Sequence, residues 1–186
     1  MSKQQNILQA ALKLIVNNGL HSVTMAQIAD EARVGIGTIY RNFKDKEDIV
    51  QKVWIAQKIE ESAFVFKHYN PEGTVKQRFW YLWKQVILYF LHHKTEYYFS
   101  YHFAASPILT EDIHNIAMND FLAFDEMFQE GIDQNLFKEN LTARQLRLYT
   151  FSSINGWLLW SFDLEIDIDE AQINLYTQML WDAVKV

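Results

Sequence analysis

Polar side chains that suit a nucleic acid are concentrated between residues 38 and 42. Thr38 and Tyr40 carry hydroxyl groups, which can donate hydrogen bonds to phosphate oxygens. Arg41 and Asn42 carry the groups that pair most favourably with the edges of guanine and adenine, respectively. These residue types at this spacing indicate a contact with DNA.

Gly35 and Gly37 precede this group and allow two interpretations. A Gly-x-Gly pattern can begin a dinucleotide-binding motif, but that motif requires a preceding strand and a third glycine, and the sequence predicts neither. The second interpretation is the start of a short helix whose bare backbone a phosphate can approach closely. A glycine inside a helix lowers the stability of the helix by about 1 kcal/mol relative to alanine. The second interpretation therefore requires that the glycines serve something other than local stability.

Residues 24–42 have the pattern of a helix-turn-helix. The segment TMAQIADEA predicts one short helix, a tight RVG connection follows, and a second short helix carries the polar group described above. Thr24 and Gln27 stand at the start of the first helix, which would cross the DNA backbone, and Lys46 adds a phosphate contact near the next helix start. Small and apolar residues fall where these helices would pack on each other and on residues 3–18, namely Ile28, Ala29, Val34 and Ile39. The alternative is an ordinary helical hairpin.

The elements that position these residues are predicted to be helical almost throughout. Proline occurs only at positions 71 and 107, and no segment shows the alternation of a strand. A hydroxyl residue followed three positions later by glutamine predicts capping boxes at Ser2, Thr24, Thr74 and Thr142. Asp45 predicts a further helix start. The all-α prediction comprises helices over residues 3–18, 24–31, 35–42, 45–68, 74–93, 95–104, 108–134, 142–163 and 168–184.

Composition limits the classes of protein to which the chain can belong. The chain has 186 residues, a formal net charge of −6 and no cysteine. The lack of cysteine excludes a disulfide framework and thiolate chemistry, so we expect a cytoplasmic protein. Residues 1–50 hold six basic and five acidic residues, so the predicted DNA-contacting part is near neutral while the remainder is acidic. The histidines lack metal-ligand spacing and no catalytic motif occurs, so we expect no metal, no cofactor and no enzymatic activity.

The segment from ILQAA to KDKEDIV resembles the N-terminal domain of TetR-family transcriptional regulators. The features that carry the resemblance are ILQAA, Gly19, Thr24, IADEA, GTIY, Phe43 and KDKEDIV. The resemblance implies an all-helical homodimer with a DNA-binding domain over residues 1–48 and a ligand-binding and dimerisation domain over residues 49–186.

The same resemblance assigns roles to individual residues. It implies phosphate contacts by Thr24, Thr38, Tyr40 and Lys46, and a groove-facing set formed by Gly35, Ile36, Gly37, Arg41 and Asn42. Arg33 stands where the family usually has a glycine, and at a positive φ it would carry a strain of about 1–2 kcal/mol. Ile36 is apolar where the family pattern is often polar, and it could read a thymine methyl group.

Aromatic residues, which form 15% of the chain, are the candidates for lining a ligand cavity. Filling an ordinary core is the alternative for each ring. Ligand pockets are mostly apolar with a few placed polar groups, and we expect His102 and Asn155 to supply these groups. The candidate rings are Trp83, Phe90, Phe99, Phe103, Phe124, Phe128 and Phe151. The predicted inducer is a small lipophilic or aromatic compound, including a lipophilic cation held by ring faces.

The last two predicted helices suit the pairing of two copies of the chain. Ser152 and Gly156 are small residues beside bulky rings, which would let another helix approach closely. The final helix carries a stripe formed by Ile173, Tyr176, Leu180 and Val184. Two such helices from each subunit would form a four-helix bundle, whereas packing within one subunit is the alternative.

These patterns together predict a repressor that binds a palindromic operator as a homodimer and is released from it by a small inducer. A dimer would place two recognition helices about one DNA turn apart, or a multiple of it. A small helical enzyme that uses the aromatic cavity, or a protein-interaction module without DNA contact, are the alternatives from other classes.

Overall fold

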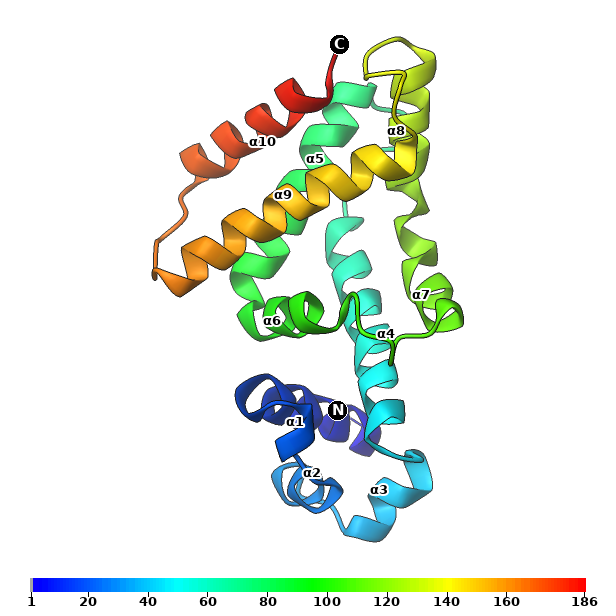
Figure 1. The fold of residues 1–186 in the computed structure, drawn as a ribbon, viewed down its shortest axis with the longest axis vertical. Helices are drawn as coiled ribbons and strands as arrows, with labels where there is room; N and C mark the ends of the chain where they lie inside the picture. The colour runs from blue at the N-terminus through cyan, green and yellow to red at the C-terminus, as the bar shows by residue number, and fades with distance from the viewer. Residues whose placement is uncertain (1) are drawn as a thin grey trace. The chain divides into compact units, whose positions relative to one another are not determined.

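A computed structural model describes residues 2–186, and every regular element in this part of the chain is a helix (Figure 1). The all-α prediction is confirmed. No helix within these residues is both long and apolar enough to cross a membrane. The helices are α1 (Lys3–Asn18), η1 (Leu20–Ser22), α2 (Met25–Glu31), α3 (Ile36–Asn42), α4 (Lys46–Val65), α5 (Val75–His92), α6 (Lys94–Phe103), α7 (Glu111–Met118), η2 (Asn119–Phe121), α8 (Leu122–Asp133), α9 (Ala143–Asp163) and α10 (Glu170–Val184).

The helices start where the capping boxes were predicted. At Thr24 the hydroxyl oxygen accepts a hydrogen bond from the backbone N–H of Gln27 at 3.2 Å, and Gln27 Oε1 accepts one from the backbone N–H of Thr24 at 2.8 Å. The same reciprocal pair forms at Ser2, Thr74 and Thr142. Asp169 starts α10 with a further box. A cap of this kind stabilises a helix by about 1 kcal/mol, so these boundaries follow from local sequence.

Three helices end at a residue other than glycine with a left-handed backbone. Arg33 (φ 54°) follows α2, Asn135 (φ 56°) follows α8 and Glu165 (φ 53°) follows α9. The backbone N–H groups of Arg33 and of the next residue donate to carbonyl oxygens in the last turn of α2, at 3.0 Å each, which is the Schellman arrangement. Glycine usually occupies this place and asparagine sometimes does, so Asn135 is an ordinary helix end, whereas Arg33 and Glu165 give no clear signal in the sequence.

The prediction of a single helix over residues 108–134 is wrong, since α7, η2 and α8 occupy this region. Asn119 and Asp120 lie at the interruption. Short polar side chains such as these compete for backbone hydrogen bonds and favour helix ends over helix interiors. Asp120 Oδ2 also accepts a hydrogen bond from Ser62 Oγ at 3.0 Å, a long-range contact that a local pattern does not reveal.

The described chain forms two compact units, of which the first comprises the residues up to 60 together with residues 93–118. In this unit α1 packs against α2 and α6. Phe99 of α6 is fully buried in the same core, and its ring stacks on Phe103 with centroids 4.8 Å apart. The core also contains Ile7, Ala11, Ile15, Ile28, Ala29, Ile39, Phe43, Ile49, Val50, Val53 and Trp54.

The second unit comprises residues 61–92 and 119–186, and aromatic rings dominate its core. The ring of Phe79 on α5 lies 5.2 Å from that of Trp181 and 5.9 Å from that of Phe128, centroid to centroid. Gly131 is required here, because a Cβ at this position would lie 2.2 Å from the ring of Phe137. The two units are defined by which residues pack together and not by what they do. The predicted functional division between residues 48 and 49 therefore stays a prediction.

Candidate functional site

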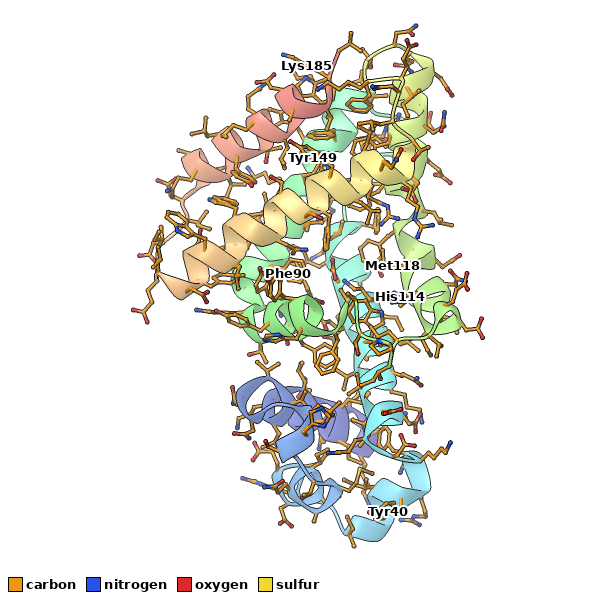
Figure 2. All side chains as sticks on the ribbon, in the orientation of Figure 1. Tyr40, Phe90, His114, Met118, Tyr149 and Lys185 are labelled. Carbon is orange, nitrogen blue, oxygen red and sulfur yellow. The ribbon has the colours of Figure 1, made fainter. Side chains whose placement is uncertain are left out.

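Helix α3 exposes residues that were predicted to contact DNA and buries those that hold the helix in place. Ile39 and Phe43 are buried in the core of the first unit. Tyr40 is 60% exposed and Ile36 is 44% exposed, and Figure 2 shows Tyr40 projecting from α3. The buried pair fixes which face of this short helix is presented to solvent.

Gly35 and Gly37 lie on this exposed part of α3 without an internal reason for being glycine. A Cβ added to either residue would meet no atom within 4 Å. Neither has a positive φ, so no left-handed backbone requires glycine at these positions. Gly35 is the N-cap of α3, a position where glycine is well tolerated. Gly37 lies inside the helix, so a steric demand for glycine there must come from outside the protomer, or the lost helix propensity has no compensation.

Arg41 and Asn42 are exposed, and both are hydrogen-bonded to the half-buried Thr38. Arg41 Nη2 donates to Thr38 Oγ1 at 3.3 Å, and Asn42 Nδ2 donates to the Thr38 carbonyl oxygen at 2.7 Å. These bonds hold the two side chains along α3, and contact with a base edge would exchange them for bonds to DNA. Thr38 thus combines a predicted phosphate contact with the positioning of its two neighbours.

Thr24 and Gln27 are exposed at the first turn of α2, as the DNA-binding prediction requires. Their polar groups serve the capping box, in which Thr24 Oγ1 also donates to Gln27 Oε1 at 3.0 Å. The structure therefore gives both residues a local role in starting α2, and a phosphate contact would be additional to it.

Lys46, in contrast, is half-buried and bonded to the protein. Its Nζ donates to the carbonyl oxygens of Leu20 and Val23, at 2.8 Å each. These carbonyls lie just before the start of α2, so the ammonium group ties the first turn of α4 to the entry of α2. Two of its three donors are engaged in this way. Lys46 is therefore first of all a positioning residue of the predicted DNA-binding domain over residues 1–48, which we call the head.

Replacing Lys46 with methionine is expected to destabilise the first unit by about 2 kcal/mol, because a charged donor is lost and two carbonyl oxygens lose their partner. Urea unfolding followed by circular dichroism measures this. Lys44→Met is the matched control, since Lys44 is an exposed lysine two residues away. Equal stability of the two variants would contradict the role assigned to Lys46.

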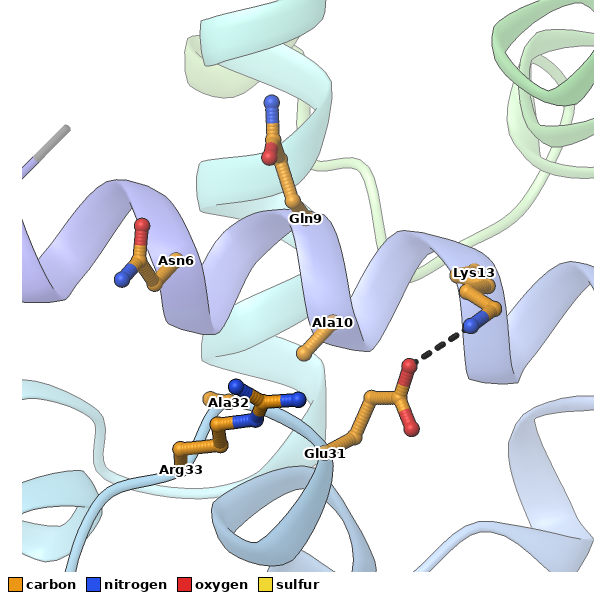
Figure 3. A pocket seen from close by; sticks show the side chains of 7 residues that line it. All are labelled: Asn6, Gln9, Ala10, Lys13, Glu31, Ala32 and Arg33. Carbon is orange, nitrogen blue, oxygen red and sulfur yellow. Dashed lines mark hydrogen bonds and ion pairs between the residues drawn. The ribbon is translucent and has the colours of Figure 1, made fainter.

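Arg33 borders the crevice that Figure 3 shows between α1 and the α2–α3 turn. The crevice has a volume of ≈ 330 Å³ and is lined by Asn6, Gln9, Ala10, Lys13, Glu31, Ala32 and Arg33. Lys13 Nζ and Glu31 Oε1 form an ion pair across it at 2.7 Å, and this ion pair holds the pKa of Glu31 below its usual value. Strain of about 1–2 kcal/mol was expected at Arg33 if its φ were positive, and the structure confirms that φ is positive.

The aromatic ligand candidates on α5, α8 and α9 all lie in the second unit. Trp83 is at their centre, with its ring centroid 4.9 Å from that of Phe124, 6.4 Å from Phe128 and 6.5 Å from Phe151. Phe90 is fully buried and Asn155 is half-buried. These rings pack edge-to-face or tilted against one another, the geometry that aromatic cores favour.

The candidates on α6 lie in the first unit and have different surroundings. Phe99 belongs to the buried core cluster that also contains residues of α1 and α4, and the partly buried Phe103 packs against this cluster. His102 is exposed, and its ring is 5.8 Å from that of Tyr101. His102 is therefore not buried in the protomer, and its assignment as a polar group of the ligand cavity stays a prediction.

The predicted pairing residues on α9 are exposed. Ser152 is exposed, and a Cβ added to the exposed Gly156 would meet no atom within 4 Å. Tyr149 and Trp160 lie on the same face of α9 at helical spacing and are more than half exposed. This face combines a glycine and a serine with two large rings that the protomer leaves more than half exposed.

The predicted stripe on α10 faces the interior of the protomer. Ile173, Leu180 and Val184 are buried, and Tyr176 donates from its hydroxyl to the Ser153 carbonyl oxygen at 2.7 Å. Burial within the protomer thus corrects the assignment of Ile173, Leu180 and Val184 to a contact between subunits, while that of the half-buried Tyr176 stays a prediction. The large exposed apolar residues of α10 are Leu175 (63%) and Met179 (57%), an i,i+4 pair that the longer buried stripe obscured in the sequence.

Comparison with known proteins places the head of this chain among DNA-binding domains. Residues 7–53 match the family model for bacterial regulatory proteins of the tetR family. The fatty acid metabolism regulator protein of Bacillus subtilis (strain 168) is 29% identical over 155 residues, which cover 82% of this chain and 80% of that protein. The HTH-type transcriptional regulator AcrR of Shigella flexneri is 23% identical, covering 87% of this chain and 82% of that protein.

Solved structures share the fold over the whole chain. A TetR family transcription regulator from Shewanella sp. PV-4 has a TM-score of 0.89 with 23% identity, and the match covers 100% of both chains. The transcriptional regulator FadR from Bacillus subtilis, in complex with stearoyl-CoA, has a TM-score of 0.80 with 21% identity, covering 97% of this chain and 98% of that one.

Proposed function

This chain belongs to the TetR family of bacterial regulatory proteins, and on that premise we propose that it is a repressor released from a palindromic operator by a small lipophilic ligand. The observation that carries the proposal is the presentation of α3, which exposes Ile36 and Tyr40 beside two glycines while Ile39 and Phe43 anchor it from within. A helix held in this way can enter a major groove without disturbing the core.

The proposed DNA contacts divide into two kinds. Thr24, Thr38 and Tyr40 offer hydroxyl groups for phosphate oxygens, which fix the position of the head but carry no sequence information. Arg41 and Asn42 are the candidates for base edges. Lys46 keeps one donor for a phosphate while its other two hold the entry of α2.

We propose that two copies pair through the exposed faces of α9 and α10. On α9 this pairing face consists of Tyr149, Ser152, Gly156 and Trp160, and on α10 of Leu175 and Met179. Large apolar side chains that are more than half exposed at regular spacing are typical of a protein–protein contact. Pairing would also place two reading heads on one operator, as a palindrome requires.

The proposed ligand is a fatty acyl thioester. The relative that is 29% identical over most of both chains is named a regulator of fatty acid metabolism, and the FadR structure from Bacillus subtilis contains stearoyl-CoA. A long acyl chain suits an interior built from apolar and aromatic side chains such as those around Trp83. An aromatic lipophilic cation, which ring faces also attract, is the competing ligand class.

Ligand binding is proposed to favour a dimer whose two heads are wrongly spaced for the operator. Helix α4 contributes residues to both units, so it is a helix through which one unit can influence the other. Because coupling between two sites is reciprocal, operator DNA should weaken ligand binding by the same factor as the ligand weakens DNA binding.

The test is a mobility-shift titration of the purified protein on the DNA upstream of its own gene, at several salt concentrations. Binding that weakens steeply with salt is expected, because phosphate contacts release counterions. Stearoyl-CoA should then lower the DNA affinity by about tenfold, within the usual range of allosteric coupling.

Coenzyme A alone and the lipophilic cation tetraphenylphosphonium are the controls, and neither should release the DNA. If the folded dimer gives no shift even at low salt, the chain is not an operator-binding repressor. If tetraphenylphosphonium releases DNA and stearoyl-CoA does not, the ligand is a lipophilic cation and the acyl proposal is wrong.

A further inference from the structure

Ile36 is the one apolar side chain at the start of the exposed α3 helix. It is the first residue of α3 and is 44% exposed. Gly35 and Gly37 flank it, so across these three positions Ile36 carries the sole side chain. A Cβ added to either glycine would meet no atom within 4 Å, so the positions on both sides of Ile36 along the chain are open.

An apolar side chain can recognise only one feature of the major groove. Hydrogen-bond donors and acceptors line the edges of every base pair, whereas the C5-methyl group of thymine is the apolar element. Deepening the repressor function proposed above, on which this inference rests, we propose that Ile36 determines specificity by packing against the C5-methyl group of a pyrimidine in each operator half-site.

The surroundings of Ile36 favour this contact. Tyr40 lies one helical turn further along the same face and is 60% exposed, so its ring extends the apolar surface that Ile36 begins. The flanking glycines let the backbone come close enough for a short branched side chain to reach a methyl group. A lone exposed isoleucine is common on protein surfaces. An experiment that removes only the methyl group of the base distinguishes an isoleucine that reads this group from an ordinary surface residue.

The experiment combines a single-atom change in the DNA with a single-residue change in the protein. Selection from a randomised duplex pool defines the preferred half-site, and each thymine in it is then replaced in turn by deoxyuridine, which differs only by the C5-methyl group. Affinities are measured by fluorescence polarisation for the wild type, for Ile36→Ala and for Ile36→Val.

At one position, deoxyuridine is expected to weaken binding to the wild type roughly fourfold for each half-site changed, the value of one buried methyl group. The same replacement should change the affinity of Ile36→Ala less than twofold. In Ile36→Val it should weaken binding by nearly the same factor as in the wild type. If the half-site has cytosine at that position, 5-methyldeoxycytidine should strengthen binding by the same factor. Tyr40→Phe, which keeps the ring and removes the hydroxyl group, should keep the deoxyuridine effect.

Two results would overturn the inference while leaving the repressor function intact. In one, the protein selects a half-site but no pyrimidine methyl group affects its affinity. In the other, the methyl effect is equally large in Ile36→Ala, so another residue reads it. Failure to select any duplex would overturn the proposed function as well, and the three results are distinguishable. Ile36 is outside the buried core, and thermal denaturation by circular dichroism checks that each variant folds.

Discussion

Replacing Gly37 with alanine is expected to weaken operator binding by about two orders of magnitude and to stabilise the isolated protein at the same time. The gain follows from helix propensity, because alanine in a helix is favoured over glycine by about 1 kcal/mol and the added Cβ meets no atom within 4 Å. The loss follows from the close approach of α3 to the DNA, which the extra methyl group prevents in both heads of a dimer.

The two effects have opposite signs, so no general damage to the fold can imitate the result. Urea unfolding measures the first effect, and a salt-controlled polarisation titration with operator DNA measures the second. Asn17→Ala is the matched control, because Asn17 is an exposed residue in α1 where alanine also improves helix propensity. The control should be stabilised without any loss of DNA affinity. Normal DNA binding by Gly37→Ala would show that α3 does not approach DNA closely.

Replacing Gly156 with arginine is expected to convert the dimer into a monomer and to lower operator affinity by about 10²–10⁴-fold, the usual value of linking two binding modules. The open space around Gly156 accommodates the longer side chain within one protomer. In the proposed pair, however, the same side chain would lie where α9 of the partner approaches, beside Tyr149 and Trp160. A bulky charge there would be buried without a partner.

Sedimentation equilibrium measures the change in association, and the polarisation titration measures its effect on DNA binding. Asn140→Arg is the control, since it adds the same charge at an exposed loop position between α8 and α9. The control should remain dimeric. A dimeric Gly156→Arg would contradict the α9 pairing face, whereas a monomer with undiminished operator affinity would contradict the need for two heads.

The sequence by itself determined the starts of the four helices with predicted capping boxes, α1, α2, α5 and α9, and the organisation of the head. A capping box needs only two residues three positions apart, so Thr24 and Gln27 predict the start of α2 without knowledge of the rest of the fold. The burial of Ile28, Ile39 and Phe43 likewise follows from helical spacing, and it fixes which side of α3 is exposed.

Only the tertiary structure decided which polar and apolar side chains remain available for a partner. Lys46 and the carbonyls of Leu20 and Val23 are more than twenty positions apart, and no local pattern predicts their hydrogen bonds. On α10 two apolar stripes share one helix, and packing against the rest of the protomer buries Ile173 and leaves Leu175 exposed. Helical periodicity specifies which residues share a face. What covers that face depends on segments distant in the chain, and therefore on the whole fold.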